Sequence, residues 1–197
     1  IVSVVLKDKK GREIVINKDQ SPRPETTIEG LAKLPTVYGS PTVTAGNAPG
    51  LSTGAAMVTL MSREEAVKRG LKPLATIIGH AQASGHPDGI ASIPAEAAKK
   101  ALQKANLTID QIQLIEVNEA FAVMPLVTTK ILGEGNEEKV EALRKITNVN
   151  GGAIAIGHPT GATAARLVMT VCREMQRQAG CGSFRWESFT SYYITLF

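Results

Sequence analysis

The chain has 197 residues, of which 43% are hydrophobic and 20% charged, a composition that fits a globular protein and excludes a disordered one. The net charge of +4 is spread over short basic runs without interleaved aromatics, so we expect no nucleic-acid partner. An ordinary solvated surface accounts for this charge, and a phosphate-bearing ligand would also suit it. Every apolar run is shorter than the roughly eighteen residues of a membrane span, so no membrane association is predicted.

The N-terminal third predicts a hairpin followed by a long loop. Residues 1–17 form two apolar runs around a polar turn that ends at Gly11, a residue that can take a positive φ. Residues 18–49, rich in Pro, Thr and Gly, are expected to be loop. The small apolar run 54–61 is then a candidate buried strand.

Strands and helices are expected to alternate after residue 61. Ser62 and Glu65 have the spacing of a capping box for a helix that closes at Gly70, and 74–79 is the next candidate strand. Further on, the pattern predicts a helix opened by Pro94, a strand at 111–117, a helix over 120–131 that Pro125 kinks or begins, and a last helix. The apolar stripes are Ala97, Ala98, Ala101, Leu102 and Ala105; Ala120, Val123, Met124, Val127 and Ile131; and Ala164, Val168, Val171 and Met175. This alternation predicts an α/β layered domain.

Aromatic residues are distributed unevenly. Only eight occur, and six of them lie in the last fourteen residues. We therefore expect residues 181–197 to be a tail distinct from the preceding domain.

Cysteine usage favours a reducing compartment. Cys172 and Cys181 are too few for a disulfide framework and have no metal-ligand spacing. Cys172 lies on an apolar helical stripe and is expected in the core. The N-terminus has neither a starting Met nor a basic leader and resembles a strand entered midway, so a fragment is expected. We predict a cytoplasmic protein, with the mitochondrial matrix and the peroxisome as alternatives.

His158 stands in the densest motif, NVNGGAIAIGHPTGAT at 148–163. It lies between a glycine and a proline just before a helix, where a histidine can accept a proton or donate to an oxyanion. A structural histidine in a turn is the alternative. His80 and His86, six residues apart, lack the spacing of metal ligands and are expected to be structural or on the surface, and no metal site is predicted.

Two further segments point to a ligand site. NEAFA at 118–122 follows a predicted strand, at the end where open α/β sheets bind ligands. Asn118 is expected to cap the next helix, and the alternative is that it holds a water or a carbonyl oxygen. TVTAGNAPGLSTG at 42–54 has small residues along which a ligand can lie, although a plain loop is the simpler interpretation.

These three segments, in this order, resemble the thiolase family, together with Arg23-Pro24 and the Leu31–Leu34 run before them. The resemblance covers about residues 1–178 and indicates the C-terminal half of an acetyl-CoA acetyltransferase or 3-ketoacyl-CoA thiolase. It implies a thiolase-like layered α/β fold with part of the loop excursion. The expected parts are the end of that excursion with its coenzyme A side (1–49), the C-terminal domain (50–180) and the divergent tail (181–197).

The resemblance also implies the chemistry. Thiolases transfer an acyl group between an enzyme cysteine and coenzyme A, which is a substrate, so no separate cofactor is expected. His158 matches the histidine that activates the cysteine and stabilises a thioester oxyanion, and Asn118 matches the asparagine that positions a water. Arg23 matches a position near the nucleotide end of coenzyme A, while Ala45, Pro49 and Gly50 match the loop beside its pantetheine arm. Acyl-CoA thioesters are the expected ligands, with a homo-oligomer or a complementary N-terminal half as partner.

The sequence departs from the family pattern at several positions. Pro49 stands where a serine is common, and Ala164 where a glycine is usual. The nucleophilic cysteine belongs to the N-terminal half, and Ser188 stands roughly at the place of the second catalytic cysteine. The chain alone is therefore not expected to turn over, and whether it belongs to an active enzyme is left open. The alternatives are a thiolase half that acts with a partner, a non-catalytic CoA or thioester binding module, and an assembly partner that uses the tail.

Overall fold

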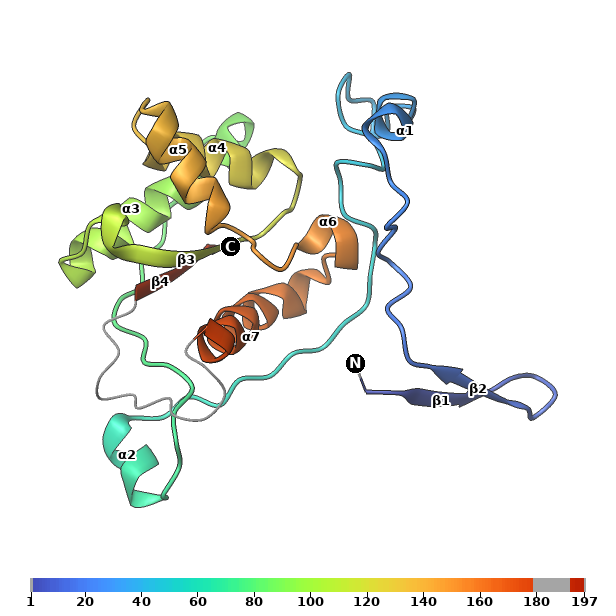
Figure 1. Ribbon diagram of the computed structural model, residues 1–197, viewed down its shortest axis with the longest axis horizontal. Coiled ribbons are helices and arrows are strands. Elements are labelled where there is room, and N and C mark those ends of the chain that lie inside the picture. Colours follow the sequence, from blue (N-terminus) through green and yellow to red (C-terminus); the bar gives the residue numbers. More distant parts are fainter. Residues whose placement is uncertain (1, 179–191, 197) are drawn as a thin grey trace.

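A computed structural model describes residues 2–178 and 192–196. Its buried core forms around one strand, β3 (Ile112–Val117). Every position of β3 except Gln113 is buried, which is the pattern of a strand covered on both faces. β4 (Tyr192–Leu196) pairs with it in parallel (Figure 1). The strand expected at 111–117 is therefore confirmed.

Helices cover both sides of this pair. α3 (Ile93–Ala105), α4 (Val123–Leu132) and α5 (Glu137–Lys145) lie on one side and α7 (Thr160–Gln178) on the other (Figure 1). This helix–sheet–helix layering confirms the α/β class. The core that β3 forms with α3, α4 and α5 consists of Ala95, Ala98, Leu102, Ile112, Ile115, Val117, Met124, Leu132 and Leu143.

α3 forms as its sequence predicts. Pro94 lies in the first turn, where its missing N–H costs nothing, and Ala98 and Leu102 face the core. Asn106 ends the helix in the left-handed conformation, with φ of 54°. The backbone of Asn106 closes the last turn by donating to Gln103 and Leu102.

α4 has a more polar buried face than its stripe predicted. Pro125 occupies the first turn and so begins the helix without breaking it. Val123, expected on the buried face, is exposed, whereas Thr128 and Thr129 are fully buried. Thr129 satisfies its hydroxyl by donating to the carbonyl of Pro125 at 2.8 Å, which allows a polar residue to face the core.

The buried face of α7 also differs from the predicted stripe. Val171 is buried as expected, but Ala164 is exposed and Leu167 is fully buried. The buried face also contains Ala162, Thr163, Cys172 and Glu174. An apolar stripe could not identify this face because two of its members are polar and find their partners in the folded chain.

α5 was not predicted. It is a short, strongly charged helix in which only Val140 and Leu143 are buried. Asn136 caps its N-terminus by accepting from the backbone N–H of Lys139 at 3.0 Å. Because α5 has so few apolar residues, its sequence shows no clear helical periodicity of apolar positions.

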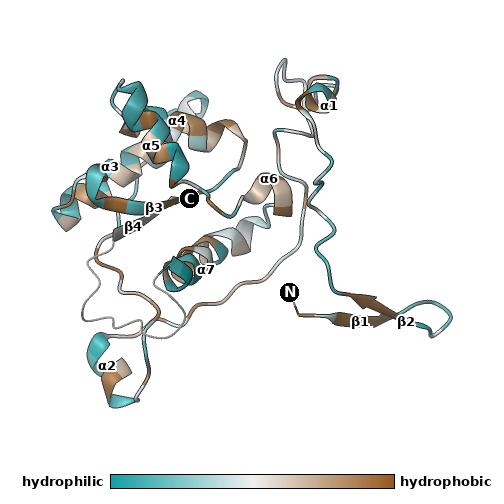
Figure 2. Ribbon diagram, viewed as in Figure 1, coloured by the Kyte–Doolittle hydropathy of each residue, from teal (hydrophilic) through white to brown (hydrophobic). Residues whose placement is uncertain are grey.

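The expected N-terminal hairpin is confirmed. β1 (Val4–Lys7) pairs antiparallel with β2 (Glu13–Ile16), and Gly11 has a φ of 77° in the turn. Asp8 holds the turn by accepting from Arg12 and Lys10. The hairpin is largely hydrophobic, is exposed, and lies away from the helices around β3 (Figure 2).

The segment before α3 contains two short α-helices, α1 (Ile28–Ala32) and α2 (Arg63–Lys68). Ser62 caps α2 by accepting from the N–H of Glu65, and Gly70 follows with φ of 62°, both as expected. The remaining short elements of the described chain are the 3-10 helices η1 (Pro87–Ser92) and η2 (Ile109–Gln111) and the helix α6 (Ala153–Ile156).

The two predicted strands before α3 are wrong. Residues 54–61 and 74–79 are extended but pair with no strand of the described chain, and their large side chains are exposed, Leu60 at 69% and Ile77 at 66%. A strand needs a neighbour for its backbone hydrogen bonds, and the described sheets offer them none. An apolar run alone does not determine whether a neighbouring strand is available.

Most of the predicted tail, including Cys181 and Ser188, lies outside the described residues. Residues 192–196 of that tail supply β4. In the part of the chain that the structure describes, no helix is both long and apolar enough to cross a bilayer.

Candidate functional site

The three motif segments meet at the carboxyl end of β3. The loop at 42–54 is tied to the segment after β3 by a hydrogen bond from the N–H of Ala122 to the carbonyl of Asn47, at 2.9 Å. Its other end lies against the third motif, because a Cβ added to Gly157 would stand 2.5 Å from Ser52 Oγ. Gly157 also has a φ of 93°, so both its conformation and this close approach require glycine.

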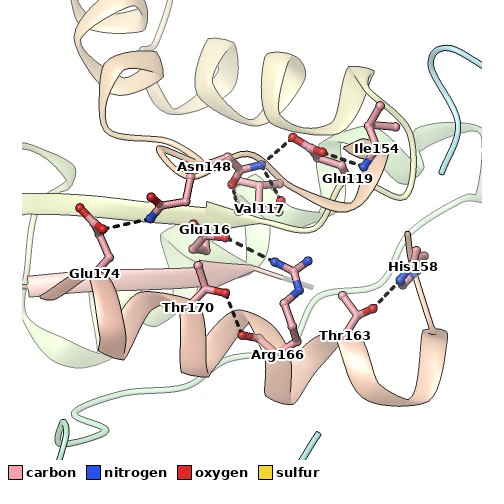
Figure 3. Close-up of polar contacts among 11 residues, drawn as sticks. Glu116, Val117, Glu119, Asn148, Ile154, His158, Thr163, Arg166, Thr170 and Glu174 are labelled. Atoms are coloured by element: carbon pink, nitrogen blue, oxygen red, sulfur yellow. Dashed lines mark hydrogen bonds and ion pairs between the residues drawn. The ribbon is translucent and has the colours of Figure 1, made fainter. Parts of the chain in front are cut away.

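His158 and Asn118 lie side by side in this arrangement. Asn118 Nδ2 is 3.3 Å from His158 Nε2, although the two residues are 40 positions apart in the chain. Asn118 is buried and His158 is half-buried. On its other side the imidazole is held by α7, with Nδ1 2.7 Å from Thr163 Oγ1 (Figure 3). The structure thus brings together the two residues that the sequence singled out as catalytic.

Asn118 does not cap the helix that follows it. The N-cap of α4 is Ala122, four residues later, and it makes no side-chain capping bond. Asn118 Oδ1 is buried and has no hydrogen-bond partner among the described residues. A buried acceptor without a hydrogen bond destabilises the folded state. This favours the alternative interpretation, that a water or a ligand group binds at this position.

Glu119 and Asn148 hold the motif at 148–163 against the end of β3. The side chain of Asn148 pairs with the backbone of Val117, accepting from its N–H at 2.8 Å and donating to its carbonyl at 2.9 Å. Glu119 accepts from Asn148 Nδ2 and from the N–H of Ile154, both at 3.0 Å (Figure 3). These contacts fix where His158 stands.

Neither of these residues was singled out as functional. In the folded chain Asn148 has a φ of 48°, a conformation that asparagine tolerates better than most residues. Gly152 completes the arrangement, because a Cβ there would be 2.5 Å from the Glu119 carboxylate. Gly152 and Gly157 therefore allow close packing against Glu119 and Ser52.

Buried charges line the contact between β3 and α7 (Figure 3). Glu116 is 1% exposed, and burial raises its pKa to about 7 against the opposing effect of Arg166, whose Nη1 is 3.9 Å away. The pKa of Glu174 is instead lowered to about 2, because its carboxylate accepts from Arg177, Asn150 and Gln178. The two carboxylates thus behave oppositely although both are buried.

The four residues predicted to bind coenzyme A lie in the chain before α2. Pro49 is half-buried, while Ala45 and Gly50 are exposed, and all three lie in the segment that contacts the 157–159 turn through Ser52 and Gly54. Arg23 is exposed in the chain before α1, where its carbonyl accepts from Thr26. No described contact joins Arg23 to His158.

The remaining candidates lie outside this site. His80 and His86 are exposed, as expected, and His86 caps η1 by accepting from the N–H of Asp88 at 3.4 Å. Cys172 is buried in α7, also as expected. Burial raises the pKa of its thiol, so it is a poor source of thiolate.

Two family descriptions match the chain. "Thiolase, C-terminal domain" matches residues 71–184, and "Thiolase, N-terminal domain" matches residues 1–64. The predicted domain boundaries at 49/50 and 180/181 stay predictions.

Curated relatives are similar over most of this chain. The acetyl-CoA acetyltransferase of Syntrophomonas wolfei is 46% identical over 180 residues, which are 90% of this chain and 43% of that protein. A β-ketoadipyl-CoA thiolase of Acinetobacter baylyi is 44% identical over 91% of this chain and 44% of its own length. The chain thus spans less than half the length of the relatives it matches.

Solved structures give the same result. The Bacillus anthracis acetyl-CoA acetyltransferase superposes with a TM-score of 0.77 at 37% identity, over 91% of this chain and 43% of the other. Human mitochondrial 3-ketoacyl-CoA thiolase superposes with a TM-score of 0.72 at 34% identity, over 90% of this chain and 43% of its own. With the C-terminal family description matching more than half of its residues, this chain belongs to the thiolase family.

Proposed function

We propose that the chain supplies the histidine–asparagine side of a thiolase active site that acts on acyl-CoA and 3-ketoacyl-CoA thioesters. The observation that carries this proposal is the 3.3 Å approach of Asn118 Nδ2 to His158 Nε2 at the carboxyl end of β3. The names of the relatives support the substrate class, since each refers to an acyl group on coenzyme A.

The chemistry follows from what these two side chains can do. A neutral His158 takes the proton of an attacking thiol at Nε2, and the imidazolium formed then donates to the oxyanion that develops on the thioester. Asn118 adds a second polar group beside that oxyanion, either its amide N–H or a water held at the open Oδ1. Together they stabilise negative charge on a carbonyl oxygen bonded next to sulfur.

Among the described residues, the one cysteine is not suited to be the nucleophile. Cys172 is buried within α7 and its pKa is raised, so we assign it no catalytic role. Covalent acyl transfer needs a thiolate within reach of His158, which we propose is the cysteine of a thiolase N-terminal half. The chain acts with that half or as a homo-oligomer in a reducing compartment, which we propose is the cytoplasm.

We propose that Arg23 and residues 45–50 bind coenzyme A. Ala45, Pro49 and Gly50 present small or rigid surfaces beside which a pantetheine arm can lie, and Gly50 and Ser52 border the turn at Gly157. Arg23, exposed before α1, is proposed to contact the nucleotide phosphates, which a guanidinium binds by charge-assisted hydrogen bonds. Coenzyme A is a substrate in this proposal, and we propose no separate cofactor and no metal.

Reconstitution tests the proposal. The chain is mixed with a separately produced N-terminal part of the Syntrophomonas wolfei acetyl-CoA acetyltransferase, and thiolysis of acetoacetyl-CoA is followed spectroscopically. We expect turnover from the mixture and none from either part alone. His158→Asn or Asn118→Ala should lower that turnover by roughly 10²-fold or more, the usual loss for an oxyanion donor or general base.

The matched control is His86→Asn, because His86 is an exposed histidine outside the site. This variant should keep full turnover. A mixture that is folded and associated but inactive contradicts the enzymatic proposal. If that inactive mixture still binds CoA by calorimetry, the chain is a non-catalytic thioester-binding module.

A further inference from the structure

The hydroxyl of Thr163 links His158 to the backbone of α7. Thr163 is 2% exposed, and its Oγ1 lies 2.7 Å from His158 Nδ1 and 3.1 Å from the carbonyl oxygen of Pro159. Together with Asn118 these groups form a chain of three hydrogen bonds, Asn118–His158–Thr163–Pro159. A hydroxyl has one hydrogen, so the direction of this chain is restricted.

The two ends of the chain determine its direction. The Asn118 amide nitrogen can only donate, which makes His158 Nε2 the acceptor and leaves it without a proton. The Pro159 carbonyl can only accept, so the Thr163 hydrogen points to it. Oγ1 then has a lone pair for Nδ1, and a neutral imidazole must carry its proton there.

We propose that Thr163 is a positioning residue that fixes the Nδ1–H tautomer of His158 and so keeps Nε2 unprotonated and able to accept a proton. This inference rests on the proposed function for its catalytic meaning, because the base that takes a thiol proton has to be an unprotonated Nε2. The opposite tautomer would present an N–H to the thiol and could not accept. Thr163 contacts no reacting atom and acts only through His158.

The tautomer is measurable in the 197-residue chain without any substrate. The chain has three histidines, and His158→Asn assigns the His158 signals in long-range ¹H–¹⁵N spectra of ¹⁵N-histidine-labelled protein. In spectra recorded at about pH 8 we expect His158 to be mainly Nδ1–H, with Nε2 resonating as an unprotonated nitrogen. His80, which is exposed, serves as the reference for the tautomer mixture in solvent.

Substitution of Thr163 should change that population. Thr163→Val should lower the Nδ1–H to Nε2–H ratio about tenfold, the effect of losing one net hydrogen bond of about 1.4 kcal/mol. Thr163→Ser restores the hydroxyl and should restore the ratio. Thr170→Val is the matched control, because Thr170 Oγ1 makes the same bond to a carbonyl four residues earlier, that of Arg166 at 3.0 Å, on the same helix.

Two results would overturn the proposal. One is a wild-type His158 that is mainly Nε2–H, and the other is a wild-type ratio in folded Thr163→Val. If Thr163→Val does not fold, the wild-type spectrum and the Thr163→Ser spectrum still decide. A chain that shows the Nδ1–H tautomer but gives no thiolysis on reconstitution contradicts the proposed function and leaves the role of Thr163 intact.

Discussion

Glu116 makes the stability of the fold depend on pH. Its pKa is raised from 4.5 to about 7 because its carboxylate is buried, and Arg166, 3.9 Å away, offsets this only in part. The folded state therefore holds this proton more tightly than the unfolded state, so stability falls as pH rises from 4.5 to about 7 and is then level. At 1.36 kcal/mol per pKa unit, the loss is about 3 kcal/mol. Glu116→Gln should abolish that loss and be the more stable protein at about pH 8 in urea unfolding.

A matched surface carboxylate separates this effect from general charge removal. Glu96→Gln removes an exposed carboxylate on α3 that pairs with Lys99 at 3.7 Å, and it should leave the pH dependence unchanged. Glu174 acts in a different window, because its lowered pKa stabilises the fold above 4.5 and that contribution is lost as pH falls through about 2. If Glu116→Gln keeps the wild-type slope between about pH 5 and pH 8, Glu116 is ionised at low cost.

Among the elements, α5 depends on its cap more than α2 does. Asn136→Ala removes a 3.0 Å bond to the N–H of Lys139 in a helix whose Val140 and Leu143 are buried against the core. We expect the free energy of unfolding to fall by about 1 kcal/mol, the usual cost of losing an N-cap. Chemical denaturation monitored by circular dichroism measures it.

The comparison variant is Ser62→Ala, which removes an equivalent cap from α2 at 3.2 Å. α2 buries only Ala66, so it can fray without opening the core, and global stability should change little. Equal losses for the two variants would show that α2 unfolds together with the core.

The elements that the sequence predicted are those whose signals are local. The hairpin has a glycine turn, α3 has a proline in its first turn and a row of small apolar residues, and four of the six residues of β3 are large and apolar. Residues 54–61 have a similar run but no neighbour to pair with, and strand pairing is a property of the whole fold. The buried face of α7 was misplaced because Thr163 and Glu174 are polar.

The residues of the candidate site also differ in whether the sequence identifies them. His158 and Asn118 could be recognised from short motifs, and the structure places them in contact. Glu119 and Asn148 could not be recognised, since they act on each other and on backbone groups about thirty positions away in the chain, such as Val117. Such contacts follow only from the folded arrangement of the end of β3 and residues 148–154.

At the scale of the molecule, buried structure is concentrated around β3, while the extended segments remain uncovered. Residues 54–61 and 74–79 expose large apolar side chains, among them Met57 at 85% and Ile77 at 66%. Exposed apolar segments with unpaired backbone are the kind of surface that pairs with another chain. This is consistent with the proposal that the chain works with a complementary half or a second copy.

Hydrogen exchange followed by mass spectrometry tests that view of the whole chain. At low protein concentration the amides of β3 should exchange most slowly, because the strand is buried and paired with β4, whereas 54–61 and 74–79 should exchange within the shortest labelling time. Protection of those two segments that grows with protein concentration would identify a second copy as the partner. Protection that appears only on adding a thiolase N-terminal half would identify the complementary chain. Slow exchange in both segments at every concentration would contradict the exposed, unpaired arrangement.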